Sequence, residues 1–176
     1  MSQEYIKSLI RSIPDYPQKG IIFRDITPLL NHEYGLSLIK NELLNSITYH
    51  VDFNKIVAIE ARGFILGTLL AMLDIRPLVL ARKPGKLPGE VLQKKYKLEY
   101  GEDAICIQLS DIEKGDNILI IDDLVASGGT AKATCDIVEA LGGKVVACYF
   151  LIELDELGGR KFLEDSGIKV ITSIHY

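Results

Sequence analysis

Tryptophan is missing from this chain of 176 residues, and sulfur-containing residues are few, with two methionines and three cysteines. The cysteines, Cys106, Cys135 and Cys148, stand alone inside apolar segments, without the paired spacing of a metal site or a disulfide framework. We therefore expect them to be reduced core residues of a cytoplasmic protein.

Long apolar runs are also missing. No stretch reaches the ~18 apolar residues of a membrane-spanning helix, and the segment from Met1 to Lys7 lacks the apolar region of a signal peptide. Positive charge is not in excess either, because 24 acidic residues outnumber 20 lysines and arginines and give a net charge of −4. These absences disfavour a membrane protein and general binding to nucleic acid.

What the chain does contain is the composition of an ordinary globular protein, and its length predicts a single domain over residues 1–176. Short apolar runs alternate with helical patterns. The predicted strands cover residues 55–60, 77–81, 104–109, 117–121, 144–152 and 168–173, and the predicted helices cover residues 2–12, 34–49, 63–73 and 129–141. This alternation predicts an α/β fold with a mostly parallel, twisted sheet flanked by helices.

The most informative segment is residues 118–130, Ile-Leu-Ile-Ile-Asp-Asp-Leu-Val-Ala-Ser-Gly-Gly-Thr. Its aliphatic run predicts a buried strand, and ligands in open α/β sheets bind beyond the carboxyl ends of such strands. Asp122 and Asp123 stand at that end. The following loop can hold a phosphate with backbone amides at the start of a helix, and its glycines allow close approach. The loop consists of Ala126, Ser127, Gly128, Gly129 and Thr130.

A Gly-Gly pair after a strand, taken alone, indicates only a tight turn that caps a helix. The ordered combination of strand, two carboxylates and small-residue loop is far rarer. It matches neither a Walker P-loop nor a dinucleotide-binding fingerprint. The backbone amides can bind a phosphate, and the neighbouring carboxylates can bind hydroxyl groups. This combination favours a sugar phosphate as the ligand.

Two cationic segments extend this prediction. The first segment also follows an apolar strand and reads Glu60-Ala61-Arg62-Gly63-Phe64. Beside the first motif, it becomes a second candidate anion site. The planar guanidinium of Arg62 can bind two phosphate oxygens at once. Without the first motif, segment 60–64 would indicate only a turn between a strand and a capped helix. The polar stretch 82–101 is a predicted lid loop. We assign its Arg82, Lys83 and Lys86 to the phosphate site.

Two further residue groups are candidates for recognition and proton transfer. Glu99 ends the predicted lid and is its candidate proton-transfer group. Phe23 is most simply a core residue, and its functional interpretation is a platform for a flat heterocycle, with the backbone of Ile22 and Arg24 meeting the edge of that ring.

Together these motifs resemble the adenine phosphoribosyltransferases, a family of type I phosphoribosyltransferases. The resemblance runs from about residue 12 to the C-terminus and rests on the segments 20–28, 61–64, 82–89, 98–101, 118–130 and Leu157-Gly158-Gly159-Arg160-Lys161. Ser127 stands where threonine is more usual, and Glu60 stands where aspartate is frequent. The segment 118–130 alone indicates only the type I phosphoribosyltransferase superfamily. The segments 20–28 and 82–89 resemble the members that act on adenine.

The resemblance implies transfer of the 5-phosphoribosyl group from phosphoribosyl pyrophosphate (PRPP) to adenine, with Mg²⁺, giving AMP and pyrophosphate. It implies that the loop 126–130 holds the 5′-phosphate and that Asp122 and Asp123 hold the ribose hydroxyls. It places pyrophosphate on Ala61, Arg62, Arg82, Lys83 and Lys86, and adenine on Ile22, Phe23 and Arg24, with Glu99 assisting catalysis. Mg²⁺ would be held mainly by substrate and water, without a dedicated protein site, and the chain would form a homodimer.

Two alternatives remain open at this point. Another phosphoribosyltransferase, acting on xanthine, hypoxanthine-guanine or orotate, would share residues 118–130 and differ around Phe23. A PRPP-sensing transcriptional regulator would keep the sugar-phosphate loop without catalysis, and should carry a nucleic-acid-binding module or a basic face.

Overall fold

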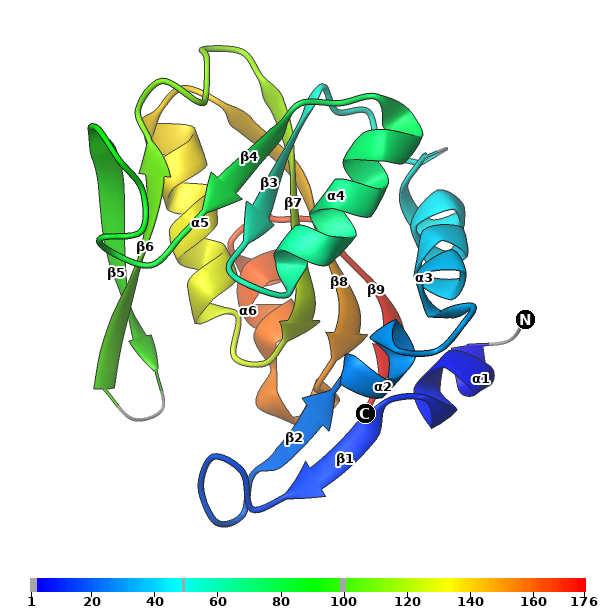
Figure 1. The fold of residues 1–176 in the computed structure, drawn as a ribbon. Helices are drawn as coiled ribbons and strands as arrows, with labels where there is room; N and C mark the ends of the chain where they lie inside the picture. Colours follow the sequence, from blue (N-terminus) through cyan, green and yellow to red (C-terminus); the bar gives the residue numbers. More distant parts are fainter. Residues whose placement is uncertain (1–2, 49, 99–100) are drawn as a thin grey trace. The chain divides into compact units, whose positions relative to one another are not determined.

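The computed structural model describes residues 3–48, 50–98 and 101–176 (Figure 1). The backbone groups into two compact units, Met1–Asn45 and Ser46–Tyr176, which are described separately below. The single domain over residues 1–176 therefore stays a prediction. Within the described residues, no helix has both the length and the apolar character needed to cross a bilayer.

The larger unit is built on a five-stranded sheet with the order β4-β3-β7-β8-β9, in which every neighbouring pair is parallel (Figure 1). The strands are β3 (Lys55–Ile59), β4 (Leu78–Ala81), β7 (Asn117–Val125), β8 (Lys144–Glu153) and β9 (Val170–His175). The residues from Ile118 to Ile121 are fully buried, as expected for a central strand covered on both faces. The predicted α/β fold with a parallel sheet is confirmed.

Helices connect these strands. Helix α4 (Gly63–Asp74) follows β3, α5 (Gly129–Ala140) follows β7, and α6 (Gly159–Asp165) comes after β8. The connection from β3 to β4 runs in one direction along the sheet, and the connection from β7 to β8 runs in the other. Because parallel crossovers are right-handed as a rule, α4 and α5 are expected on opposite faces of the sheet. Helix α4 packs closely on β3, because a Cβ atom at Gly67 would lie 2.7 Å from the Cβ of Ala58.

A hairpin of β5 (Val91–Leu98) and β6 (Gly101–Gln108) adds a small antiparallel sheet. It packs against α5, where Lys94 forms an ion pair of 3.1 Å with Asp136. Residues 91–98, which the predicted lid loop includes, form a strand in the structure, and the role of the segment as a lid stays a prediction. Within the described part of this segment, the irregular connection is residues 82–90, because Tyr96, Ile105 and Ile107 are buried in the core and draw residues 91–98 into a strand pair.

The smaller unit contains α1 (Gln3–Ser8), β1 (Arg11–Pro14), β2 (Ile22–Asp25), α2 (Thr27–Leu30) and α3 (Gly35–Leu43). A π-helical turn, Leu44–Thr48, follows α3. The helix predicted over residues 2–12 ends at Ser8, because Arg11–Pro14 pairs antiparallel with β2. The buried residues of this unit are mostly aliphatic: Ile6, Ile10, Ile26, Leu29, Leu38, Ile39 and Leu43.

Asp25 fixes the turn between β2 and α2. Its carboxylate accepts hydrogen bonds from the backbone amide of Thr27 (2.9 Å) and from Nη2 of Arg11 (2.6 Å). The Thr27 hydrogen bonds, followed by those of Arg11, lower the pKa of Asp25 from 3.8 to about 2. A carboxylate with a lowered pKa stabilises the fold above its ordinary pKa, and this stabilisation is lost as the pH falls toward 2.

We therefore expect Asp25→Asn to reduce the free energy of unfolding by up to about 2 kcal/mol above pH 5 and to flatten the loss of stability between pH 5 and pH 2.5. Thermal unfolding followed by circular dichroism across this range measures the effect. Asp52→Asn, at an exposed position, is the control and should follow the wild type. If the stability of the wild type and of Asp25→Asn fell in parallel as the pH was lowered, the prediction would be contradicted.

Candidate active site

The carboxyl ends of β3 and β7 lie side by side, because the two strands pair in parallel from Lys55 and Ile118 to Ala58 and Ile121. The chain leaves β3 toward β4 and leaves β7 toward β8, so its direction reverses between these two strands. Crevices at such switch points are the usual ligand sites of open α/β sheets. The two anion segments predicted from the sequence, 60–64 and 122–130, meet at this reversal.

The carboxylate pair Asp122 and Asp123 lies in this crevice. The side chain of Asp123 is 5% exposed, and its Oδ2 forms an ion pair of 2.7 Å with Nε of Arg62, which joins the two strand ends. The backbone amide of Asp123 donates a hydrogen bond of 2.8 Å to Oδ1 of Asp122. Asp123 is therefore held from the β3 side, and Asp122 lines the neighbouring cavity.

Burial dominates the electrostatics of this pair. It raises the pKa of Asp122 well above the ordinary value, and the negative charge of Asp123 raises it further. Burial also raises the pKa of Asp123, although the charge of Arg62 opposes this. Two buried carboxylates with raised pKa values are stabilised by added positive charge or by hydrogen-bond donors such as sugar hydroxyls.

Gly63 is a residue whose role the sequence did not reveal. A Cβ atom at this position would lie 2.8 Å from Oδ1 of Asp122 and 2.9 Å from the carbonyl oxygen of Ile121. Only glycine lets the start of α4 approach the carboxylate pair this closely. A glycine directly after the arginine of a strand-end motif is the sequence signal that could have indicated this contact.

The loop after β7 surrounds a cavity of about 190 Å³. Gly128 has a φ angle of +82° and caps α5, which starts at Gly129. The first amides of an α-helix have no partner within the helix, so they are available to an anion. The cavity is lined by Asp122, Leu124, Val125, Ala126, Ser127, Gly128, Gly129, Thr130, Ala131 and Phe150. All five residues of the predicted phosphate loop are in this lining.

The cationic segment after β4 is tied to the strand end of β3. Oε2 of Glu60 accepts hydrogen bonds from Nε of Arg82 (3.2 Å) and from the backbone amide of Lys83 (2.8 Å). Nη1 of Arg82 donates to the carbonyl of Lys86 (3.1 Å), which closes the turn 83–86. The peptide bond between Glu60 and Ala61 is cis. Glu60 thus brings Arg82 and the turn beside segment 60–64.

The three predicted pyrophosphate cations of this segment differ in their surroundings. The Lys86 side chain is exposed. Nζ of Lys83 forms an ion pair with Asp103 and a hydrogen bond of 2.9 Å with the hydroxyl of Tyr96. Burial acts against the charged amine, but the hydrogen bonds to Asp103 and Tyr96 outweigh it and raise the pKa of Lys83. Lys83 therefore points to the β5–β6 hairpin and is a firmly held cation.

The predicted adenine-binding residues lie in the smaller unit, on β2. Ile22 is 48% exposed. Phe23 is half-buried and meets the ring of Tyr16 edge to face, with 5.2 Å between ring centroids. Nη1 of Arg24 donates to Oγ of Ser12 on the paired strand. The strand thus carries an aromatic ring and an exposed aliphatic side chain at consecutive positions, which point to opposite faces. Glu99 lies outside the described residues.

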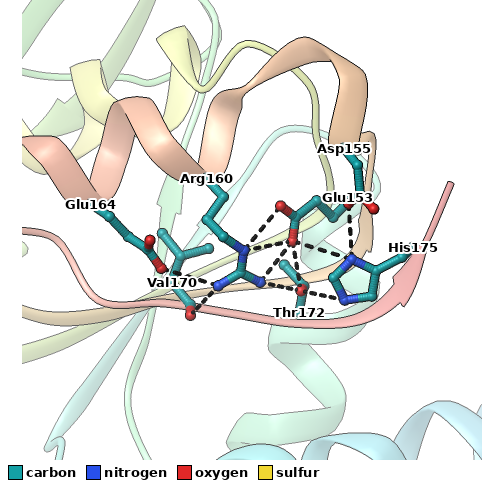
Figure 2. Close-up of polar contacts among 7 residues, drawn as sticks. All are labelled: Glu153, Asp155, Arg160, Glu164, Val170, Thr172 and His175. Carbon is teal, nitrogen blue, oxygen red and sulfur yellow. Dashed lines mark hydrogen bonds and ion pairs between the residues drawn. The ribbon is translucent and has the colours of Figure 1, made fainter.

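Two groups of potential metal donors occur in the described residues of the larger unit. Asp122 and Asp123 offer the oxygen donors that Mg²⁺ prefers, and a bound cation would favour their ionised forms. Among the described ranges, three potential metal donors come within 4.8 Å of one another at Glu153, Asp155 and His175. There the guanidinium of Arg160 already neutralises Glu153 (Figure 2).

Comparison with known proteins places this geometry in a family. Residues 37–175 match the family model of the phosphoribosyl transferase domain. The adenine phosphoribosyltransferase of Rubrobacter xylanophilus is 47% identical over 173 residues, covering 98% of this chain and 92% of that protein.

Two solved structures of adenine phosphoribosyltransferases agree with this match. The one from Thermoanaerobacter pseudethanolicus has a TM-score of 0.95 at 43% identity, covering 99% of this chain and 100% of its own. The one from Giardia lamblia, complexed with 9-deazaadenine, has a TM-score of 0.93 at 33% identity, covering 100% of this chain and 98% of its own. The resemblance predicted from the motifs is confirmed, and the chain belongs to the adenine phosphoribosyltransferase family.

Proposed function

We propose that this protein transfers the 5-phosphoribosyl group of PRPP to adenine and so makes AMP for purine salvage. The observation that carries the proposal is the meeting of a buried carboxylate pair, a small-residue loop at a helix start and a cationic segment at one sheet edge. Adenine as the acceptor is supported by the family, including the Giardia lamblia member whose structure contains 9-deazaadenine.

In this proposal each part of the crevice binds one part of PRPP. The amides and hydroxyls of the loop 126–130 hold the 5′-phosphate. Asp122 and Asp123 accept hydrogen bonds from the ribose hydroxyls, and their charge stabilises the positive charge that develops on the sugar ring. The pyrophosphate group lies on the cationic side, which consists of Ala61, Arg62, Arg82, Lys83 and Lys86.

The reaction exchanges one bond for another at ribose C1. The bond to the pyrophosphate oxygen breaks, and pyrophosphate leaves with the electron pair. A bond forms between C1 and N9 of adenine, and the N9 proton is released. We propose that Glu99 assists this proton transfer and that Phe23 stacks on the purine. Cations around the leaving group act most strongly where its charge develops, which explains their concentration in segments 60–64 and 82–86.

Mg²⁺ fits the oxygen donors of this site and would enter with PRPP. When bound, it neutralises charge on the pyrophosphate group. It would be held mainly by substrate oxygens and water, with Asp122 and Asp123 as the carboxylates available in the crevice. We further propose a homodimer in the cytoplasm. Cys106, Cys135 and Cys148 are free and buried, which supports a reducing compartment.

A parallel assay tests the proposed function. The protein is incubated with PRPP and Mg²⁺ and with adenine, hypoxanthine, guanine or xanthine, and nucleotide formation is followed by chromatography. AMP from adenine alone is the expected result. Turnover of a 6-oxopurine would reassign the base pocket, and tight binding of PRPP without turnover of any base would favour a PRPP-sensing protein.

Phe23→Ala is expected to raise the KM for adenine by about tenfold and to change the KM for PRPP less than twofold, because one stacked base is worth about 1–3 kcal/mol. Initial rates with each substrate varied in turn measure both constants. The matched control is Tyr16→Ala, which removes the edge-to-face neighbour of Phe23 and should raise the KM for adenine less. An equal rise in both KM values would remove Phe23 from the base site.

A further inference from the structure

The segment Leu157-Gly158-Gly159-Arg160-Lys161, part of the family resemblance, has no role in the proposed reaction. In the structure its second glycine, Gly159, touches the phosphate-binding loop. A Cβ atom at Gly159 would lie 2.2 Å from the carbonyl oxygen of Ala126, and a Cβ atom at Gly128 would lie 3.1 Å from the carbonyl oxygen of Gly159. The start of α6 and the loop are therefore in direct backbone contact, with no room for a side chain between Gly159 and Ala126.

Arg160, the next residue, anchors the start of α6 to the sheet (Figure 2). Its Nε lies 3.0 Å from both carboxylate oxygens of Glu153, and its Nη2 lies 2.7 Å from Oε2 of the same residue. Nη2 also donates to Oγ1 of Thr172 (2.5 Å), and Nη1 donates to the carbonyl of Val170 (3.1 Å). One guanidinium thus joins α6 to β8 and β9.

Glu153 connects this anchor back to the strand that carries the site. It is the last residue of β8, and its side chain is only 7% exposed. The backbone amide of Leu154 donates to the carbonyl of Val125, the last residue of β7, at 3.1 Å. The loop 126–130 is therefore bounded by the end of β7 on one side and by the anchored start of α6 on the other.

We propose that Arg160 and Glu153 are positioning residues that hold α6 against the loop 126–130 and thereby set the affinity for the 5′-phosphate of PRPP. This inference rests on the proposed function, because it assigns the loop to that phosphate. Backbone amides bind an anion well only when they are fixed before it arrives, and in catalysis a displacement of about 1 Å can lower the rate about a hundredfold. Without Arg160, the buried Glu153 carboxylate loses its principal cation.

The inference predicts an effect confined to one end of the substrate. Ribose 5-phosphate contains the phosphate held by the loop but no pyrophosphate, whereas free pyrophosphate uses only segments 60–64 and 82–86. Arg160→Gln should therefore weaken ribose 5-phosphate binding by about tenfold, while pyrophosphate binding changes less than twofold. In turnover assays the KM for PRPP should rise while the KM for adenine stays within twofold of wild type.

The experiment compares three variants by isothermal titration calorimetry with ribose 5-phosphate and with pyrophosphate, beside a thermal melt. Arg160→Gln removes the charge. Arg160→Lys keeps the charge without the planar fork and should bind ribose 5-phosphate with intermediate affinity. Lys161→Gln is the matched control, because Lys161 is the residue after Arg160 in α6, is exposed and pairs with Asp165 one turn further along the same helix. It should bind both ligands as the wild type does.

The outcomes separate a positioning role from general stabilisation. Arg160→Gln with a lower melting temperature but unchanged affinity for ribose 5-phosphate would overturn the inference. If this variant does not fold, Gly159→Ala decides, since it leaves the ion pair intact and pushes directly on Ala126. Selective loss of ribose 5-phosphate binding in Gly159→Ala supports the inference, and unchanged binding overturns it. A wild-type protein that bound neither ligand would overturn the proposed function and this inference with it.

Discussion

Asp123→Asn is expected to lower kcat/KM for PRPP at neutral pH by about 10²–10³-fold, the loss that follows removal of one preorganised electrostatic partner in an active site. The amide has the shape of the carboxylate but carries no charge. The substitution removes the charge from one side of the ion pair of 2.7 Å between Asp123 and Arg62. In the proposed reaction, it also removes negative charge from the place where positive charge develops on the sugar. Steady-state rates with PRPP varied at saturating adenine measure the effect.

Asp116→Asn provides a matched control at the opposite end of the same strands. Asp116 precedes β7 and forms an ion pair of 2.6 Å with Lys55 at the start of β3, with a side chain that is 12% exposed. Its substitution removes a comparable ion pair far along the strands from the crevice, so it should lower the melting temperature and leave kcat/KM nearly unchanged. Equal kinetic losses in both variants would show that Asp123 matters through stability alone.

The carboxylate pair also sets the expected pH dependence. Because burial raises the pKa values of both Asp122 and Asp123, the pair takes up its first proton at a higher pH than a free aspartate would. Activity should therefore fall on the acid side while exposed carboxylates are still ionised. In Asp123→Asn the neighbouring charge is gone, so the acid limb of the residual activity should move to lower pH. Profiles of kcat/KM between pH 5 and 8 test this.

The second large effect is expected at Glu99. Glu99→Gln should lower kcat by about 10²–10⁴-fold, the usual contribution of a positioned proton-transfer group, with little change in the KM for PRPP. Single-turnover measurements at saturating PRPP separate the chemical step from product release. The prediction rests on the family resemblance, because Glu99 lies outside the described residues.

Glu102→Gln is the control for Glu99, since Glu102 is an exposed carboxylate three positions further along the chain. It should keep the wild-type kcat. Unchanged kcat in Glu99→Gln would remove Glu99 from the mechanism, and a loss confined to the KM for adenine would make it a binding residue.

The parts of the fold that the sequence predicted are those whose signal is local. The strand 117–121 was predicted from its run of aliphatic residues, and the helix 129–141 from the change of pattern after Gly129. The hairpin of β1 and β2 was not predicted, because β1 is largely exposed and carries no apolar alternation. Its structure comes from backbone pairing with β2, a contact between segments that no local pattern records.

Helix α6 and strand β5 were missed for other physical reasons. Helix α6 starts with Gly159, and glycine is a poor helix former that normally signals a turn. Its conformation depends on contacts with the loop after β7. Strand β5 contains Lys94, Lys95 and Lys97, which made it look like a solvated loop, yet Tyr96 between them is buried in the core.

In the candidate site, too, the sequence predicted the local features and missed the contacts between distant segments. The loop 126–130 and the carboxylates could be predicted, because one continuous segment contains them. The sequence assigned Arg62 to phosphate but could not show that its Nε pairs with Asp123, since that contact depends on the register of β3 against β7. The close approach at Gly63 and the anchoring of α6 by Arg160 were missed for the same reason. Contacts between strand ends become visible only once the strand order is known.

The strand order of the sheet also governs how the protein can be made on the ribosome. Strand β7 lies at the centre of the sheet, but it follows β3, α4, β4 and the β5–β6 hairpin in the chain. During synthesis, β3 and β4 leave the exit tunnel long before the strand that covers the inner edge of β3 exists. Any sheet that β3 and β4 form before β7 emerges has an open, apolar edge at β3, and edges of this kind promote aggregation.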